Sequence, residues 1–337
     1  MMVNDKQTLG VLLVNLGSPQ APTAEAVKPY LKQFLSDQRV VDLPAWLWQP
    51  ILQGIILRRR PARSAALYAK VWQEGGSPLL VNSRALQIKL SNRAQQQGLN
   101  WQVELAMTYG EPAMQTSLAK LQQQGVNKLV VVPLFPQYST TTTAAVYDAY
   151  QTACQQLSYQ PELLPVQNYH QQEEHLLALA SSVRKYWRQH GQAQQLLMSF
   201  HGTPEATRRK GDPYYEQCLA TGQALAQILG LEEDRYSIAF QSRFGFQKWL
   251  QPYAEPLLEA KAQQGLESVQ VICPGFAVDC LETLEEVALG FEETFIQAGG
   301  KEFGYIPCLN DADEQVEAIG TLVECVIEST GSGTTVP

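Results

Sequence analysis

The sequence predicts an α/β protein made of two similar halves, each a doubly wound, Rossmann-like unit with a parallel sheet. Near-continuous runs of Val, Ile and Leu alternate with helical patterns, and such runs are typical of parallel strands that helices cover on both faces. The chain of 337 residues, 45% hydrophobic and 17% charged, is long enough for two such units and has the composition of a globular protein. An internal repeat divides it into corresponding halves.

The repeat is clearest at the first strand of each half. Residues 10–19 and 196–204 are each an apolar run that ends in Gly, a hydroxyl-bearing residue and Pro. Further along each half, a Glu-Pro pair precedes a helical pattern that ends in Gln-Gln-Gly, and an apolar strand follows. These segments are 111–112, 123–125 and 128–135 in the first half, and 255–256, 263–265 and 269–276 in the second.

The repeat places a domain boundary near residue 165, which gives an N-terminal half at 1–165 and a C-terminal half at 166–328. We expect the last helix, about residues 315–328, to pack back onto the first half. Residues 329–337 are polar and rich in Gly, so we expect a disordered tail there.

Charge, apolar-run length and cysteine spacing argue against a nucleic-acid-binding protein, a membrane-spanning protein and a metal-cluster protein. The net charge of -8 and the pI near 5.2 argue against a nucleic-acid surface, which needs clustered Lys and Arg. The first residues lack the order of a signal peptide and no apolar run reaches membrane-spanning length, so a cytoplasmic protein is expected. The six cysteines are scattered, which predicts reduced thiols and neither a zinc knuckle nor an iron-sulfur cluster.

The candidate site combines a histidine and a carboxylate. His201 ends the apolar run that opens the second half, and Glu282 follows the apolar run at 269–276. Both are expected at carboxyl ends of strands, where open α/β sheets place their ligands, so the two side chains would face one cleft. The position that matches His201 in the first half is Leu16, which indicates that only the second half carries the chemistry.

Each of these residues also has a structural interpretation. His201 could be a core histidine bonded to backbone. Asp279 and Glu282 have the spacing of a capping box, in which Glu282 would serve the start of a helix. The functional interpretation is a row of carboxylates, because Glu286 lies one helical turn beyond Glu282 and the row could pass on cations or protons.

Three other segments carry polar or aromatic groups at expected strand or helix ends. Residues 133–143 form a hydroxyl-rich turn, either a helix cap or a polar ligand contact. Residues 240–249 mix aromatics and cations, which suits a flat, anionic, aromatic ligand, although Trp249 could also close a core. Residues 45–63 are predicted to form an apolar helix followed by the basic cluster Arg58 to Arg60. This segment could be a buried helix, a lip that admits an apolar ligand, a membrane contact, or a binding site for anionic groups.

Taken in order along the chain, these motifs resemble the ferrochelatase family, whose members insert ferrous iron into protoporphyrin IX as the last step of heme biosynthesis. The resemblance runs nearly end to end, and the ordered set is specific although each motif alone is weak. The segments that carry it are 10–19, 75–78, 136–139, 200–204, 211–214, 241–243 and 279–284.

The resemblance implies a lyase with a porphyrin cleft between its two halves. It implies that His201 and Glu282 are the catalytic and metal-contacting pair. It further implies that the porphyrin pocket is lined by Tyr138, Gln241, Arg243 and Trp249. Ferrous iron would then be a substrate, held weakly by few protein ligands, with no permanently bound cofactor. The partners would be protoporphyrin IX and iron, with possible peripheral membrane contact through residues 45–60.

The chain departs from the family pattern at three positions. Thr108 stands where many members have a basic residue, Cys280 replaces a frequent histidine, and Gly290 interrupts the row after Glu286. The scattered cysteines at the carboxyl end fit a bacterial type without an iron-sulfur cluster. Two alternatives stay open: a chelatase for another tetrapyrrole, such as coproporphyrin or sirohydrochlorin, and a porphyrin or heme carrier, or another two-lobed binding protein, in which nothing turns over.

Overall fold

A computed structural model describes residues 8–243, 245 and 247–331. The chain divides into two compact units. Unit 1 consists of Met1–Leu134, Thr140–Asn168 and Asp311–Pro337, and unit 2 consists of Phe135–Ser139 and Tyr169–Asn310. The chain therefore passes between the units more than once.

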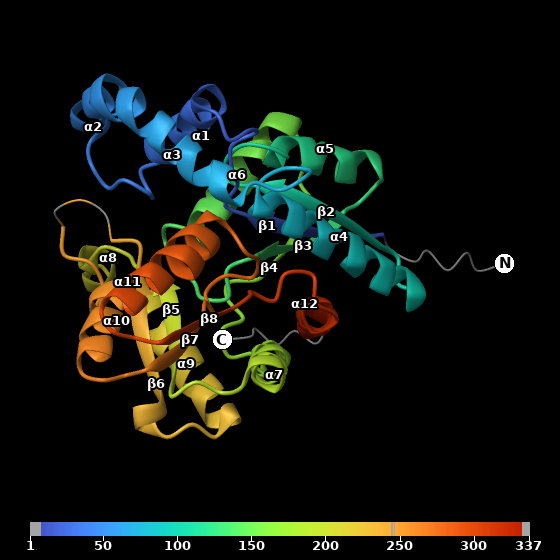
Figure 1. The fold of residues 1–337 in the computed structure, drawn as a ribbon. Helices are drawn as coiled ribbons and strands as arrows, with labels where there is room; N and C mark the ends of the chain where they lie inside the picture. The colour runs from blue at the N-terminus through green and yellow to red at the C-terminus, as the bar shows by residue number, and fades with distance from the viewer. Residues whose placement is uncertain (1–7, 244, 246, 332–337) are drawn as a thin grey trace. The chain divides into compact units, whose positions relative to one another are not determined.

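Each unit contains one four-stranded, fully parallel sheet, which confirms the predicted fold class (Figure 1). The order in unit 1 is β2-β1-β3-β4, and the order in unit 2 is β6-β5-β7-β8, so the topologies are the same. The strands of unit 1 are β1 (Leu9–Asn15), β2 (Trp101–Met107), β3 (Lys128–Pro133) and β4 (Glu162–Pro165). Those of unit 2 are β5 (Gln195–His201), β6 (Tyr236–Gln241), β7 (Ser268–Ile272) and β8 (Glu302–Ile306).

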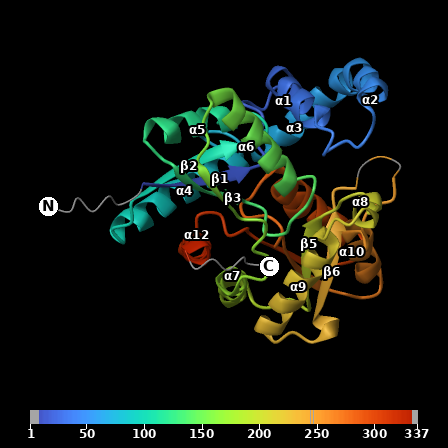
Figure 2. The same ribbon diagram turned by 180° about the vertical axis from the view of Figure 1, so that it is seen from behind.

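Unit 2 has a layered core on each face of its sheet (Figures 1 and 2). On one face, α7 (Glu173–His190) and α9 (Tyr214–Leu229) pack on Leu196, Met198 and Phe200 of β5. On the other face, α10 (Ala254–Gln263), the π-helix η3 (Glu282–Phe291) and α11 (Glu292–Gln297) pack on Leu197. The alternation of β5 side chains between the two cores follows from the two-residue repeat of a strand. Unit 2 also contains α8 (Glu205–Arg209) and the short helix η2 (Glu233–Arg235).

Unit 1 is built in the same way but has a longer insertion after its first strand. In it, α4 (Pro78–Gln96) and α5 (Met114–Gln123) pack on β2, and α6 (Thr143–Leu157) packs on α5. The insertion between β1 and α4 contains α1 (Ala24–Ser36), α2 (Ala45–Ile51), the π-helix η1 (Leu52–Ile56) and α3 (Leu57–Val71).

The helices that follow β4 and β8 are exchanged between the units. Helix α7 follows β4 of unit 1 but belongs to unit 2, whereas α12 (Asp313–Gly331) follows β8 of unit 2 but belongs to unit 1. Arg93 of α4 binds α12 through Glu317 at 2.8 Å and Glu324 at 2.9 Å, which confirms that the last helix packs on the first half. Residues 329–331 of the expected disordered tail are helical, and the rest of that tail lies outside the described residues.

Hydrogen bonds correct one part of the predicted repeat. The carbonyl of Pro112 accepts from Met107 at the end of β2, and the carbonyl of Pro252 accepts from Phe240 near the end of β6. Both prolines follow cis peptide bonds, and ten-residue helices, α5 and α10, follow both. The counterpart of Glu111-Pro112 is therefore Gln251-Pro252 rather than 255–256, which lies inside α10.

The predicted apolar helix at 45–63 is broken into α2, η1 and the start of α3. No residue of α2 is buried, so the buried-helix interpretation is wrong for this part; Trp46 is 78% exposed. Across the residues that the structure describes, no helix is both long and apolar enough to span a membrane.

Candidate active site

His201 is the last residue of β5, paired in register with Gln241 at the end of β6. Its Nδ1 lies 2.6 Å from the carbonyl oxygen of Gly202. Because a carbonyl only accepts, Nδ1 carries the proton in this contact and Nε2 of the neutral ring keeps its lone pair. The ring is half-buried, and its centre lies 6.4 Å from that of Phe276. His201 is thus a strand-end residue bonded to backbone through Nδ1, and its Nε2 forms no hydrogen bond within the described part of the chain.

Gly202 makes this strand end possible. Its N–H donates to the carbonyl of Gln241 at 2.8 Å, and a Cβ at this position would lie 2.7 Å from the same oxygen. The added atom would also lie 3.3 Å from the Trp249 ring. Glycine therefore lets the backbone after His201 stay against β6.

The capping interpretation of Glu282 does not hold. A capping box needs the Glu282 carboxylate to accept from the Asp279 N–H, but that N–H donates to Asn310 at 2.7 Å. The Asp279 carboxylate is itself engaged by Tyr305 at 2.5 Å and by Asn310 at 2.6 Å. Asp279 is therefore a structural acceptor, and no capping-box bond joins its N–H to the Glu282 carboxylate.

Glu282 begins a π-helix, where the sequence predicted an α-helix. The buried residues of η3 are Thr283, Val287 and Phe291, four positions apart. Glu282 and Glu286 each precede one of them, so the two carboxylates form a row along the edge of the buried stripe. Gly290 stands where a third member would come and ends the row. π-helical turns occur frequently at functional sites.

Gln241 joins the strand ends to this helix. Its side-chain oxygen accepts from the Ser199 hydroxyl at 2.7 Å and from the Cys273 thiol at 3.7 Å, and its amide nitrogen donates to the Glu282 carbonyl at 3.1 Å. The residue is 3% exposed. The amide therefore links β5, β6, the end of β7 and the first residue of η3.

Glu286 is held by a residue that the sequence analysis did not single out. The backbone N–H of Ser242 donates to Glu286 Oε1 at 2.7 Å, and the Ser242 hydroxyl donates to Oε2. Burial raises the pKa of Glu286, while the bonds from Ser242 and the charge of His201 lower it and the charge of Glu282 raises it further. Glu286 thus interacts electrostatically with both His201 and Glu282. The Cys280 thiol has its pKa raised by burial and then by the neighbouring Glu282 carboxylate.

The other predicted pocket residues lie in the same unit. The segment that carries Tyr138 is bound to α9, because its N–H donates to Gln217 at 2.7 Å. Trp249 is half-buried beside Gly202, and its indole N–H is buried without a partner. Arg243 is exposed, with its guanidinium 4.9 Å from the centre of the Tyr253 ring. No contact of Tyr138 or Arg243 with His201 is recorded for the described residues.

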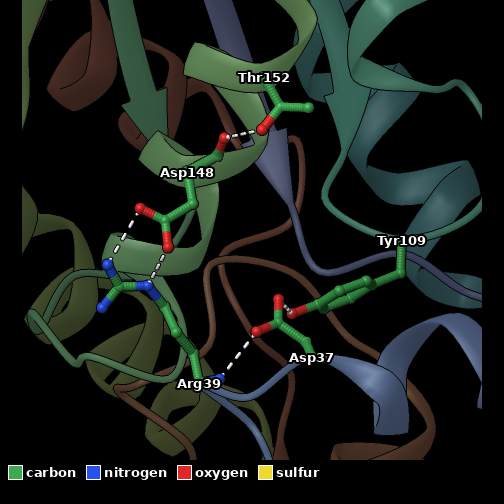
Figure 3. Close-up of polar contacts among 5 residues, drawn as sticks. All are labelled: Asp37, Arg39, Tyr109, Asp148 and Thr152. Carbon is green, nitrogen blue, oxygen red and sulfur yellow. Dashed lines mark hydrogen bonds and ion pairs between the residues drawn. The ribbon is translucent and has the colours of Figure 1, made fainter.

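Unit 1 has a polar cluster of a different kind near the end of β2 (Figure 3). The Tyr109 hydroxyl donates to Asp37 at 2.7 Å, and the other oxygen of Asp37 accepts from the Arg39 N–H at 2.8 Å. The Arg39 guanidinium binds both oxygens of Asp148 on α6. Burial, and then Asp37, raise the pKa of Tyr109. These groups satisfy one another and leave no free base.

A search of the described ranges finds no group of three or more His, Cys, Asp or Glu side chains placed to hold a metal ion. Comparison with known proteins identifies the family of the chain. A sequence model of the ferrochelatase family matches residues 8–326. The chain belongs to the ferrochelatase family. It is 50% identical over 322 residues to a ferrochelatase of Vibrio cholerae serotype O1, which covers 96% of this chain and 99% of that protein. It is also 50% identical over 324 residues to ferrochelatase 1 of Shewanella oneidensis, covering 96% and 97%.

The fold is also that of solved chelatases. SirB from Bacillus subtilis with Fe3+ superposes with a TM-score of 0.57 at 10% identity, over 97% of this chain and 98% of that one. The sirohydrochlorin chelatase SirB in complex with cobalt gives 0.50 at 10% identity, over 97% and 98%. At this identity the likeness is one of fold alone. Family membership rests on the sequence matches.

Proposed function

We propose that the protein is a ferrochelatase, a lyase of heme biosynthesis that inserts Fe²⁺ into protoporphyrin IX. The observation that carries the proposal is a strand-end imidazole, oriented by a bond from Nδ1 to backbone, in the same unit as a π-helix with a row of two carboxylates and in a chain of the ferrochelatase family. A free porphyrin holds two protons on its inner nitrogens, so insertion needs a base as well as a metal contact.

His201 takes the role of the base. Its Nε2 accepts a proton from one pyrrole N–H, the electron pair of that bond stays on the porphyrin nitrogen, and the ring becomes an imidazolium. After the imidazolium releases this proton to water, the same Nε2 takes the second pyrrole proton in the same way. The charge of His201 favours the ionised form of Glu286, and the Glu286 carboxylate in turn stabilises the imidazolium. The Nδ1–H contact with Gly202 fixes the tautomer and the orientation of the ring throughout.

Glu282 takes the role of the metal contact, and His201 shares it only while its Nε2 carries no proton. Ferrous iron accepts mixed nitrogen and oxygen ligands, and a site with few protein ligands releases the ion readily to four porphyrin nitrogens. The iron is a substrate, and the proposed reaction needs no resident cofactor and no iron-sulfur cluster.

The remaining proposed partners are a flat porphyrin and a membrane surface. Trp249 lies beside Gly202 and offers an aromatic surface next to the base, and Tyr138, Gln241 and Arg243 complete the proposed pocket lining. The exposed Trp46, Leu47 and Ile55 precede Arg58 to Arg60, an arrangement that suits peripheral contact with an anionic membrane from the cytoplasmic side.

Anaerobic insertion assays test the proposal, with Fe²⁺ or fluorescent Zn²⁺ as the metal and protoporphyrin IX as the acceptor. Turnover by the parent that collapses in His201→Ala and Glu282→Ala, with porphyrin binding retained, supports it. If the parent binds porphyrin but inserts neither metal, the protein is a carrier and both roles fall. If coproporphyrin or sirohydrochlorin is turned over faster than protoporphyrin, the protein is a chelatase for that tetrapyrrole, and the proposed roles of His201 and Glu282 are unchanged.

A further inference from the structure

Ser242 has a backbone conformation that its side chain disfavours. Its φ is 65°, in the left-handed region, where a residue with a Cβ is strained. It follows Gln241, whose side chain is fixed by partners on β5, β7 and η3. Strained conformations persist where the surroundings determine them, and they cluster at functional sites.

This conformation points two donors of Ser242 at one carboxylate. The N–H reaches Glu286 Oε1 and the hydroxyl reaches Oε2, so both oxygens of Glu286 are bonded from one residue. In an extended residue the N–H would point toward the neighbouring strand position. Ser242 is not extended, because β6 ends one position earlier, at Gln241. Glu286 is half-buried, and burial without these donors would favour its neutral form.

We propose that Ser242 is a positioning residue that holds the Glu286 carboxylate, the next member of the η3 row after Glu282, in one orientation through both of its oxygens. The inference rests on the proposed function, because the charge matters when His201 becomes an imidazolium on taking the pyrrole proton. In this role Ser242 acts through its bonds to Glu286 rather than on a substrate. Its loss should therefore lower kcat and leave the KM for porphyrin unchanged.

Three substitutions at position 242 separate the hydroxyl from the backbone strain. Ser242→Ala keeps the Cβ and loses the hydroxyl, Ser242→Gly loses both, and Ser242→Thr keeps the hydroxyl but is β-branched and more strained. If the hydroxyl positions Glu286, Ala and Gly lose kcat about tenfold, as expected for one charged hydrogen bond, and Thr retains more than either. If Ser242 only shapes the backbone, the order reverses: Gly matches the parent and Thr is the worst.

The decisive experiment is a double-mutant cycle of zinc and ferrous iron insertion with Ser242→Ala and Glu286→Gln. We expect the double variant to be no slower than Glu286→Gln alone, because the hydroxyl acts through that carboxylate. Additive losses, or a rise in porphyrin KM without a fall in kcat, would overturn the inference. A parent that inserts no metal would refute the proposed function instead, whereas an active parent with an equally active Ser242→Ala would refute only the role of Ser242. Thermal unfolding of each variant checks that the fold is intact.

Discussion

The ends of the first strands in the two units show how one topology holds two kinds of polar cluster. In unit 2, β5 ends in His201, and the neighbouring β6 leads to Ser242 and through it to Glu286. In unit 1, β1 is followed by the apolar Leu16, and β2 leads to Tyr109, which is bonded to Asp37 (Figure 3). The first cluster combines a histidine with two carboxylates of η3, whereas the groups of the second bind one another.

The loops after β2 and β6 differ in length as well. Pro112 and Pro252 occupy matching positions, but the segment between Phe240 and Pro252 is much longer than that between Met107 and Pro112. The extra residues include Arg243 and Trp249, which the resemblance assigns to the pocket. The two units therefore share one scaffold, and the proposed site of unit 2 combines a strand-end histidine, a longer loop and a π-helix.

The largest expected effect comes from giving β5 the side chain found at the matching position of β1. His201→Leu should lower kcat for iron insertion at least about a hundredfold, because general base catalysis contributes factors of that order. The apolar replacement should leave the melting temperature close to that of the parent. Insertion kinetics and thermal unfolding check this, and a variant that keeps more than a tenth of the activity would remove His201 from the mechanism.

The second effect compares the exchanged helices. His175 on α7 and Gln315 on α12 are both third in their helices and both 2% exposed. Burial lowers the pKa of His175 to about 3, so the unfolded chain binds a proton more readily than the folded one. The contribution of neutral His175 to the unfolding free energy is fully present above about pH 6.5. Below that pH it should fall by ~1.4 kcal/mol per pH unit.

His175→Gln copies the residue of α12 and should flatten this acid loss. Urea unfolding at pH values between 5 and 7 measures it. If parent and variant lose stability in parallel, His175 is not the cause.

The third effect is a loss of unfolding free energy, and it compares the ends of β6 and β2. The end of β6 has more side-chain hydrogen bonds than the end of β2, so a substitution there should cost more stability. Gln241→Leu leaves the buried Ser199 hydroxyl without its acceptor, which should cost about 1–3 kcal/mol of unfolding free energy. Thr108→Val is the matched change after β2, and it removes one bond to the Asn15 carbonyl, which keeps the backbone N–H of the same residue. Its cost should be about 1 kcal/mol or less. Equal losses would mean that the Gln241 network adds no stability.

The smallest effect belongs to the Figure 3 cluster. Tyr109→Phe removes one hydrogen bond to Asp37, whose carboxylate keeps its bond from Arg39. We expect a loss of about 0.5–1.5 kcal/mol in unfolding free energy. Chemical denaturation gives the value, and a loss above 3 kcal/mol would show that the cluster is a single cooperative unit.

The sequence was sufficient for the fold class because buried parallel strands leave long apolar runs and the repeat leaves matching turns. The positions of His201 and Glu282 at the ends of β5 and after β7 follow from the same runs. The π-helix was not foreseeable, because its side-chain pattern is that of an amphipathic α-helix. From the sequence, Ser242 could be predicted only to be a polar residue that follows a strand. Its left-handed backbone could not, because it depends on contacts with residues distant in sequence. Of the two exchanged helices, the sequence predicted only the packing of α12 on the first half; it did not predict that α7 belongs to unit 2.

The most direct test of the difference between the strand ends is a side-by-side measurement of ferrous iron insertion into protoporphyrin IX by His201→Leu and Tyr109→Phe. At saturating porphyrin and iron, we expect the unit 2 variant to lose at least about a hundredfold in rate and the unit 1 variant to match the parent. Equal losses in both, with both proteins folded, would contradict the account, because the chemistry would then depend on both strand ends.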